Sequence, residues 1–212
     1  MKSNIIVFDG ENMVITSSIL KEKYKDYANP LDKIRRETEK GNLIRLNRGI
    51  YETEGDTDPC LLASVILSPS YLSFDYALSY YGLIPEKVYT ITSASLNVRK
   101  NRTYLNRFGR YEYSDIPEQA FSEGLVCLEK EGRSIRMASM EKAVCDSLYK
   151  WRKVQSIRDL KILLFEDKRI DEEIFENSDF ELMTRLASLY HCRNTDLLIK
   201  LIRKEYTHGQ RS

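Results

Sequence analysis

Residues 41–51 constrain the fold most strongly, because apolar and basic side chains alternate there around a turn. The segments 43–46 and 50–51 are expected to form two short strands joined by a turn at Gly49. Arg45, Asn47 and Arg48 would then lie near the tip, where they face a phosphate backbone. An ordinary surface hairpin with solvated arginines explains the same residues when the hairpin is considered alone.

Two short helices are expected directly before this hairpin. The first begins at Thr16 or Ser17, either of which is a good N-cap, and continues to about Tyr24. The second has Pro30 in its first turn and stops at Gly41. Its weakly apolar face consists of Leu31, Ile34 and Thr38, and its cationic side chains are Lys33, Arg35, Arg36 and Lys40.

A helix, a basic helix and a basic hairpin follow one another as in a winged helix-turn-helix, in which the second helix enters the major groove. An earlier helix near residues 5–10 would complete that domain. The residues predicted to contact DNA are Lys33, Arg35, Arg36, Lys40, Arg45, Asn47 and Arg48. A rival interpretation takes residues 5–8 as a strand of a Mg²⁺-dependent nuclease, with Asp9 and Asn12 at its end.

The chain is long enough for one large domain or two small ones, and two are predicted: residues 1–53 and 54–212. The acidic, turn-rich residues 54–59 mark the boundary. Net charge is only +1, so any affinity for nucleic acid must come from local clustering of cations. The predicted fold class is α+β, with a winged helix-turn-helix followed by a mixed α/β domain whose C-terminal part is helical.

Periodicity gives the elements of the second domain. Helices are expected at 60–67, 73–81, 140–151, 157–165, 180–190 and 194–206. Strands are expected at 88–92, 110–114, 125–129 and 134–138.

The four cysteines lie at positions 60, 127, 145 and 192, too far apart for a Cys-x-x-Cys site, so neither a metal nor a cofactor is expected. No apolar run has the length of a signal-peptide core or a membrane span, so we expect a cytoplasmic protein without a membrane partner. Motifs for nucleotide binding or nucleophilic catalysis are absent, and no small-molecule substrate or enzymatic activity is expected.

The basic residues of segment 98–110 offer a possible second nucleic-acid surface. Its cations are Arg99, Lys100, Arg102, Arg107 and Arg110. Tyr104 and Phe108 lie between them and could stack on unpaired bases, or they could simply pack into the protein. Farther along, Glu141, Lys142 and Asp146 are expected to cap one helix and to form ion pairs along it, rather than to perform acid–base chemistry.

Several short motifs in a fixed order resemble a known family over nearly the whole chain. They are Arg48-Gly49-Ile50-Tyr51, residues 77–83, residues 108–113, and Ala138-Ser139-Met140-Glu141-Lys142-Ala143 with Asp146. The chain thus resembles the AbiEi-type antitoxins, transcriptional regulators of abortive-infection (type IV) toxin–antitoxin operons. The resemblance implies an N-terminal winged helix that binds inverted repeats in its own promoter. It also implies a C-terminal domain that neutralises a nucleotidyltransferase-like toxin.

The sequence therefore predicts a sequence-specific DNA-binding repressor and antitoxin whose partner is a double-stranded operator. A non-catalytic protein-interaction module with a winged-helix fold is the alternative, and the nuclease is the third hypothesis.

Overall fold

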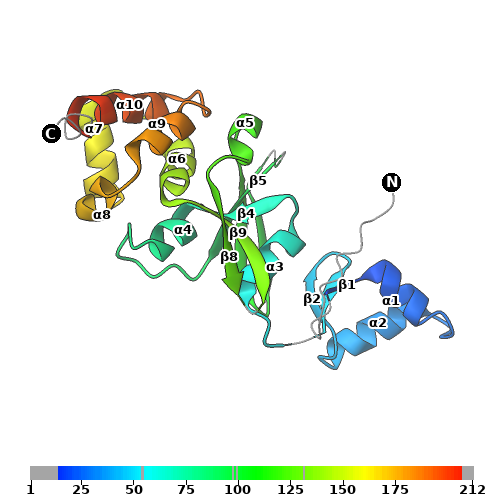
Figure 1. The fold of residues 1–212 in the computed structure, drawn as a ribbon. Helices are drawn as coiled ribbons and strands as arrows, with labels where there is room; N and C mark the ends of the chain where they lie inside the picture. Colours follow the sequence, from blue (N-terminus) through cyan, green and yellow to red (C-terminus); the bar gives the residue numbers. More distant parts are fainter. Residues whose placement is uncertain (1–13, 54, 97, 99, 131, 207–212) are drawn as a thin grey trace.

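The computed structural model describes residues 14–53, 55–96, 98, 100–130 and 132–206. They form a mixed α+β structure with two sheets (Figure 1). We call residues 14–53 the first unit and residues 55–206 the second unit. The first unit lies at one end of the molecule in Figure 1, the C-terminal helices lie at the other, and the larger sheet lies between them. The helix expected at residues 5–10 and the rival Asp9 site fall outside the described residues.

The first unit contains two helices and a three-stranded antiparallel sheet of order β1-β3-β2. Its elements are β1 (Val14–Thr16), α1 (Ser17–Lys23), α2 (Pro30–Glu39), β2 (Ile44–Asn47) and β3 (Ile50–Glu52). Both helices begin where the sequence predicts. The Thr16 hydroxyl accepts a hydrogen bond from the Ile19 amide, and Asn29 Oδ1 accepts from the amides of Leu31 and Asp32.

The two faces of this small sheet have different neighbours. Ile15 and Tyr51 lie opposite each other on β1 and β3 and pack with Leu20 and Ile34 of the helices. The other face carries Leu46, which is buried in the core of the second unit. The predicted apolar face of α2 is wrong at Leu31, which is 57% exposed because only Ile34 reaches the packed side.

The second unit is built on a mixed six-stranded sheet of order β6-β7-β5-β4-β9-β8. The β4–β9 and β5–β7 pairs are parallel, and the other neighbours are antiparallel. The strands are β4 (Ser70–Leu72), β5 (Ile91–Ser95), β6 (Arg102–Asn106), β7 (Gly109–Asp115), β8 (Leu125–Lys130) and β9 (Arg133–Ala138).

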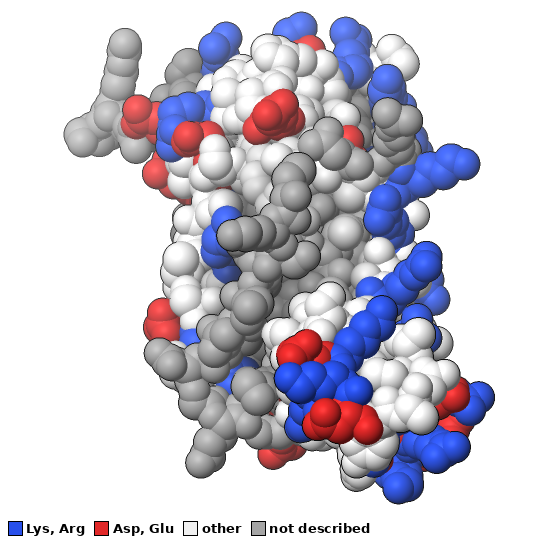
Figure 2. All heavy atoms as spheres, turned by 90° about the vertical axis from the view of Figure 1, so that its right-hand side faces the viewer, with Lys and Arg blue, Asp and Glu red and all other residues white. Residues whose placement is uncertain are grey.

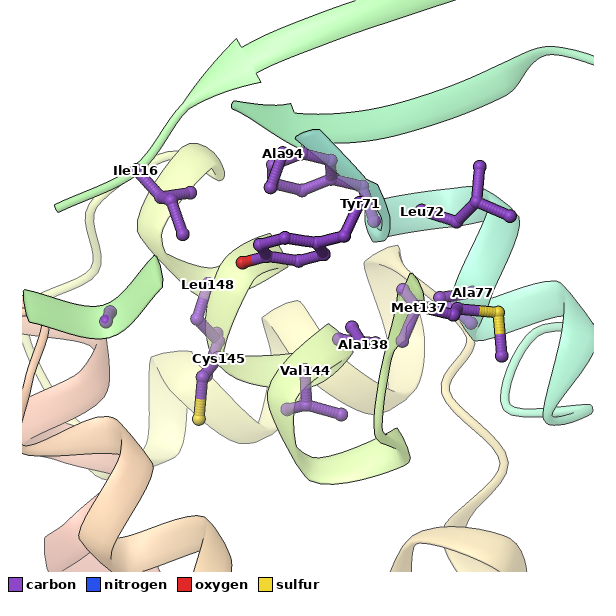
Figure 3. Close-up of a cluster of buried hydrophobic side chains, with 14 of the residues drawn as sticks. Tyr71, Leu72, Ala77, Ala94, Ile116, Met137, Ala138, Val144, Cys145 and Leu148 are labelled. Carbon is purple, nitrogen blue, oxygen red and sulfur yellow. The ribbon is translucent and has the colours of Figure 1, made fainter. Parts of the chain in front are cut away.

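Helices cover both faces of this sheet. On one face, the hydroxyls of Tyr111 and Tyr113 donate to backbone carbonyls at Pro59 and Ala63 of α3 (Pro59–Ile66). On the other face lie α4 (Phe74–Tyr80) and α6 (Met140–Lys150). Figure 3 shows how Tyr71 of β4 points into a cluster formed with residues of α6.

The C-terminal part is helical, as predicted, and packs around α6. Its elements are α7 (Ile157–Lys161), α8 (Glu172–Glu176), α9 (Phe180–Ala187) and α10 (Arg193–Leu201), with the π-helical segments η1 (Ile162–Asp167) and η2 (Ile202–Tyr206). The short helix α5 (Glu118–Phe121) precedes β8. The predicted strand at 88–92 lies instead at 91–95, because parallel pairing with β7 sets its register at Ile91 and Tyr111.

Candidate nucleic-acid interface

The outward face of α2 is centred on Arg36. Ile34 is the buried residue of this helix, and Arg36 follows it by two positions, which is about 200° around the axis. Arg36 is therefore directed away from the core and is exposed. Among the described residues, no carboxylate lies within ion-pair distance of its guanidinium group.

The other cations of α2 have acidic partners on the same helix. Lys33 Nζ lies 2.8 Å from Glu37 Oε1, and Lys40 Nζ lies 3.8 Å from the same oxygen. Arg35 lies 3.4 Å from Asp32 and 3.9 Å from Glu39. These pairs neutralise much of the positive charge that the sequence suggested for α2.

Glu37 also closes the C-terminal end of the helix. Its carboxylate accepts hydrogen bonds from Asn42 Nδ2 and Lys33 Nζ, both at 2.8 Å, and these bonds lower the pKa of Glu37 to about 2. Lys33 Nζ also lies 4.9 Å from the ring centroid of Tyr27. Lys33 is thus turned toward the α1–α2 loop and is only partly exposed.

The hairpin presents two arginines that have no carboxylate partner among the described residues. Arg45 is exposed on the edge strand β2 and lies opposite Tyr51, so it is on the sheet face that packs against the helices. Arg48 is exposed at the tip. Gly49 adopts φ +80°, a conformation that favours glycine, and its carbonyl accepts a hydrogen bond from the Ser17 amide at 2.8 Å. The tip is therefore held to the start of α1.

Asn47 has a different environment from the one predicted. Its Nδ2 donates to the Ile66 carbonyl at 3.1 Å, and its Oδ1 accepts from the Arg48 amide at 2.5 Å. The side-chain amide is thus used in the contact between the two units. The prediction that Asn47 contacts DNA is therefore replaced by a role in joining the two units.

The second basic segment forms β6, the turn after it and the start of β7. Lys100, Arg102 and Arg107 are exposed, while Arg110 forms an ion pair with Glu112 at 2.6 Å. Arg99 lies outside the described residues.

The two aromatic residues of this segment pack into the protein, which is the second of the two alternatives. Tyr104 and Phe108 pack against the core, and the Tyr104 ring forms an edge contact with Tyr113 at 5.8 Å between centroids. Both side chains are half-buried, and their packing against the core accounts for them without a contact to nucleic acid.

Figure 2 shows how the charges are distributed on the side of the molecule where the first unit lies. Lys and Arg side chains gather along one edge of this view, and Asp and Glu are interspersed among them toward the lower end. On this side of the molecule, positive charge is therefore concentrated along one edge and is partly offset by acidic side chains at the lower end.

Sequence reasoning missed the most strongly connected polar cluster, which is in the core. Lys142 and Asp146 form the expected i,i+4 pair at 3.1 Å, but both are fully buried. Asp146 also accepts hydrogen bonds from Tyr190, Ser73 and Tyr71 at 2.6, 2.6 and 3.0 Å. The i,i+4 spacing predicts the Lys142–Asp146 pair, but no local signal brings Tyr71, Ser73 and Tyr190 to it.

Cysteine chemistry has little support in the described part of the chain. Burial raises the pKa of the Cys60 thiol to about 11, so the reactive thiolate is scarce at neutral pH. Its sulfur lies 2.7 Å from the Tyr76 hydroxyl, beside a pocket of about 270 Å³. Cys127 is exposed, whereas Cys60 and Cys145 are buried. Within the described ranges, no group of three or more His, Cys, Asp or Glu residues is arranged to hold a metal ion.

Comparison with protein-family models gives no match, and comparison with curated proteins gives none either. Within the described residues, every helix is too short or too polar to cross a membrane.

Proposed function

We propose that this protein is a sequence-specific DNA-binding repressor that acts as the antitoxin of a type IV toxin–antitoxin operon and represses its own promoter. The observation that carries the DNA-binding part is the exposure of Arg36, Arg45 and Arg48 on one small unit, where no carboxylate of the described residues pairs with them. That unit has the order strand, helix, helix, hairpin, with its first strand paired to its last. A winged helix-turn-helix has this order and places its second helix in the major groove.

The acidic residues of α2 favour a groove position over a position along the phosphates. Asp32 and Glu39 flank Arg36 on the outward face, and their carboxylates would repel a phosphate backbone. In the major groove the same carboxylates can accept hydrogen bonds from cytosine amino groups, while Arg36 donates to guanine. Arg45 and Arg48 of the hairpin then supply the phosphate contacts.

The test is a binding titration with the upstream DNA of the gene at several salt concentrations. Arg45→Glu with Arg48→Glu is expected to weaken binding to all duplexes and to reduce the slope of log K against log salt by roughly 2, since each phosphate contact contributes about 0.9. Lys153→Glu with Arg158→Glu is the matched control, because both cations are exposed on the second unit and the charge change is identical. Equal losses in the two double variants would refute the hairpin assignment.

Arg36→Ala tests the reading of bases. It is expected to reduce discrimination at one base pair by about 1–3 kcal/mol and to leave binding to unrelated duplexes nearly unchanged. A uniform loss across all sequences would place Arg36 on the backbone instead.

The antitoxin part rests on the family resemblance. It is tested by co-expressing the chain with the product of the adjacent gene, which the resemblance implies to be a nucleotidyltransferase-like toxin. Growth arrest by that protein, relieved by the full chain and still relieved by the Arg45→Glu, Arg48→Glu variant, is the expected result. Continued arrest in the presence of the chain would contradict an antitoxin role.

A second candidate function is a protein-interaction module. Tyr27 and Leu31 are 52% and 57% exposed around the start of α2, and exposed apolar side chains of this size are typical of protein contacts. If this candidate is correct, the wild-type chain binds duplex DNA no more tightly than the Arg45→Glu, Arg48→Glu variant does, and Leu31→Asp abolishes capture of the partner.

A further inference from the structure

Two asparagines link the first unit to the second, and they do so reciprocally. Asn47 of β2 donates from Nδ2 to the Ile66 carbonyl of α3, and Asn106 of β6 donates from Nδ2 to the Leu46 carbonyl of β2 at 3.3 Å. In each case Oδ1 accepts an amide of the residue's own turn. Each side chain thus fixes its own turn and reaches across to the other unit.

The two carbonyls are ones that regular secondary structure leaves available. Ile66 is the last residue of α3, and the last carbonyls of a helix have no partner within the helix. Leu46 lies at the irregularity between Arg45 and Asn47, where the ladder with β3 is interrupted. An amide donor is therefore needed at both places, because a buried carbonyl without a partner is costly.

Apolar packing surrounds these two hydrogen bonds. Leu46 is 3% exposed and belongs to the core of the second unit, and Val14 and Ile50 pack against that core from β1 and β3. The hairpin that carries Arg45 and Arg48 is therefore in contact with the second unit through its strands, and not only through the chain that connects the units.

We infer that Asn47 and Asn106 are positioning residues that hold the hairpin in one direction relative to the second unit, so that the chain meets DNA as a single rigid body. The expected effect on DNA binding rests on the proposed function. The fixed orientation of the two units does not depend on DNA. A rigid pair of units loses less conformational freedom on binding than a tethered head does, and this favours affinity.

Asn→Asp at both positions is the sharpest test, because aspartate keeps the oxygen that accepts from the turn and loses the donor that crosses between the units. The matched control is Asn101→Asp with Gln155→Glu. These exposed residues of the second unit bring the same change in charge, and neither contacts the first unit.

Distances between the units are measured by pulsed electron paramagnetic resonance on the full chain. One label is on the exposed native Cys127 and the other on an introduced Lys21→Cys, in a Cys192→Ser background. The wild type and the control are expected to give one narrow distance distribution, and Asn47→Asp, Asn106→Asp a broad one. A narrow distribution in the anchor variant overturns the inference.

The DNA arm uses the upstream duplex and the anchor and control variants. The anchor variant is expected to bind roughly tenfold more weakly than the control at a temperature at which thermal unfolding shows both variants to be folded. Equal affinities for the anchor variant and its control would overturn the role of the two residues in binding. Absence of binding by the wild type would refute the proposed function instead, and the distance measurement would still decide whether the units are rigidly joined.

Discussion

Replacing Asp146 is expected to be among the most damaging changes in the second unit. Its carboxylate accepts hydrogen bonds from four side chains, and its cationic partner Lys142 is fully buried. Asp146→Asn leaves that ammonium group without an anion in the core, and removal of one partner from a buried pair costs about 3–5 kcal/mol. Lys142→Met is milder, because the remaining carboxylate keeps the hydroxyl donors of Tyr71, Ser73 and Tyr190.

The assay is urea unfolding followed by circular dichroism. With an m-value of about 2 kcal/mol/M, the midpoint of Asp146→Asn falls by roughly 1.5–2.5 M. The double variant Lys142→Met, Asp146→Asn is expected to cost at least 0.5 kcal/mol less than the sum of the single changes, roughly the lower limit for residues in contact. Lys150→Met on the same helix is exposed and is expected to change stability by less than about 0.5 kcal/mol. Additive costs in the double variant would refute the coupling.

Three further changes have defined outcomes. Burial raises the pKa of Tyr71 and Tyr190 above the ordinary value of 10, so their contribution to stability is full below pH 10 and is lost as pH rises further. Urea unfolding at a series of pH values, with tyrosinate absorbance recorded alongside, tests this. A free energy of unfolding that does not change above pH 10 would contradict it. Gly124→Ala should lower the free energy of unfolding, measured in urea, by more than Gly132→Ala does. Both glycines have positive φ, but only at Gly124 would an added Cβ contact a leucine side chain, at 2.8 Å. Equal losses of stability would exclude this clash. Asn194→Ala should lower stability by at least about 2 kcal/mol, because the buried amide bonds three backbone groups, and a loss below about 0.5 kcal/mol in thermal unfolding would refute this.

Local signals in the sequence were sufficient for the elements that carry their own caps and periodicity. The helix after Ser139 is an example, since its cap accepts from the Lys142 amide three residues later. The hairpin and both helices of the first unit were also located closely. In each case the information lies within one or two turns of chain.

Elements that depend on distant partners were missed. The three-residue strand β4 is too short to alternate, and it exists because β5 and β9 pair with it on either side. No strand is predicted at residues 102–106, and β6 forms there because it pairs antiparallel with β7 along its whole length. The hairpin sequence predicts a DNA contact for Asn47, but the side chain donates to the Ile66 carbonyl, 19 positions away. The sequence around Asn47 does not indicate this distant acceptor.

The exposure of Arg36 could be anticipated from helical periodicity, but the neutralisation of its neighbours could be anticipated only in part. Pairs such as Arg35 with Asp32 follow i,i+3 spacing. The contact of Lys33 with the Tyr27 ring depends on how the α1–α2 loop folds back, which no spacing rule gives.

The use of both faces of the β1-β3-β2 sheet determines where the chain can be cut. A fragment ending after β3 would expose Leu46 together with Val14 and Ile50. These side chains would then form an apolar surface patch that favours aggregation. Such a fragment would need polar replacements at these positions to stay monodisperse. The first unit is therefore better studied within the full chain than as a separate fragment.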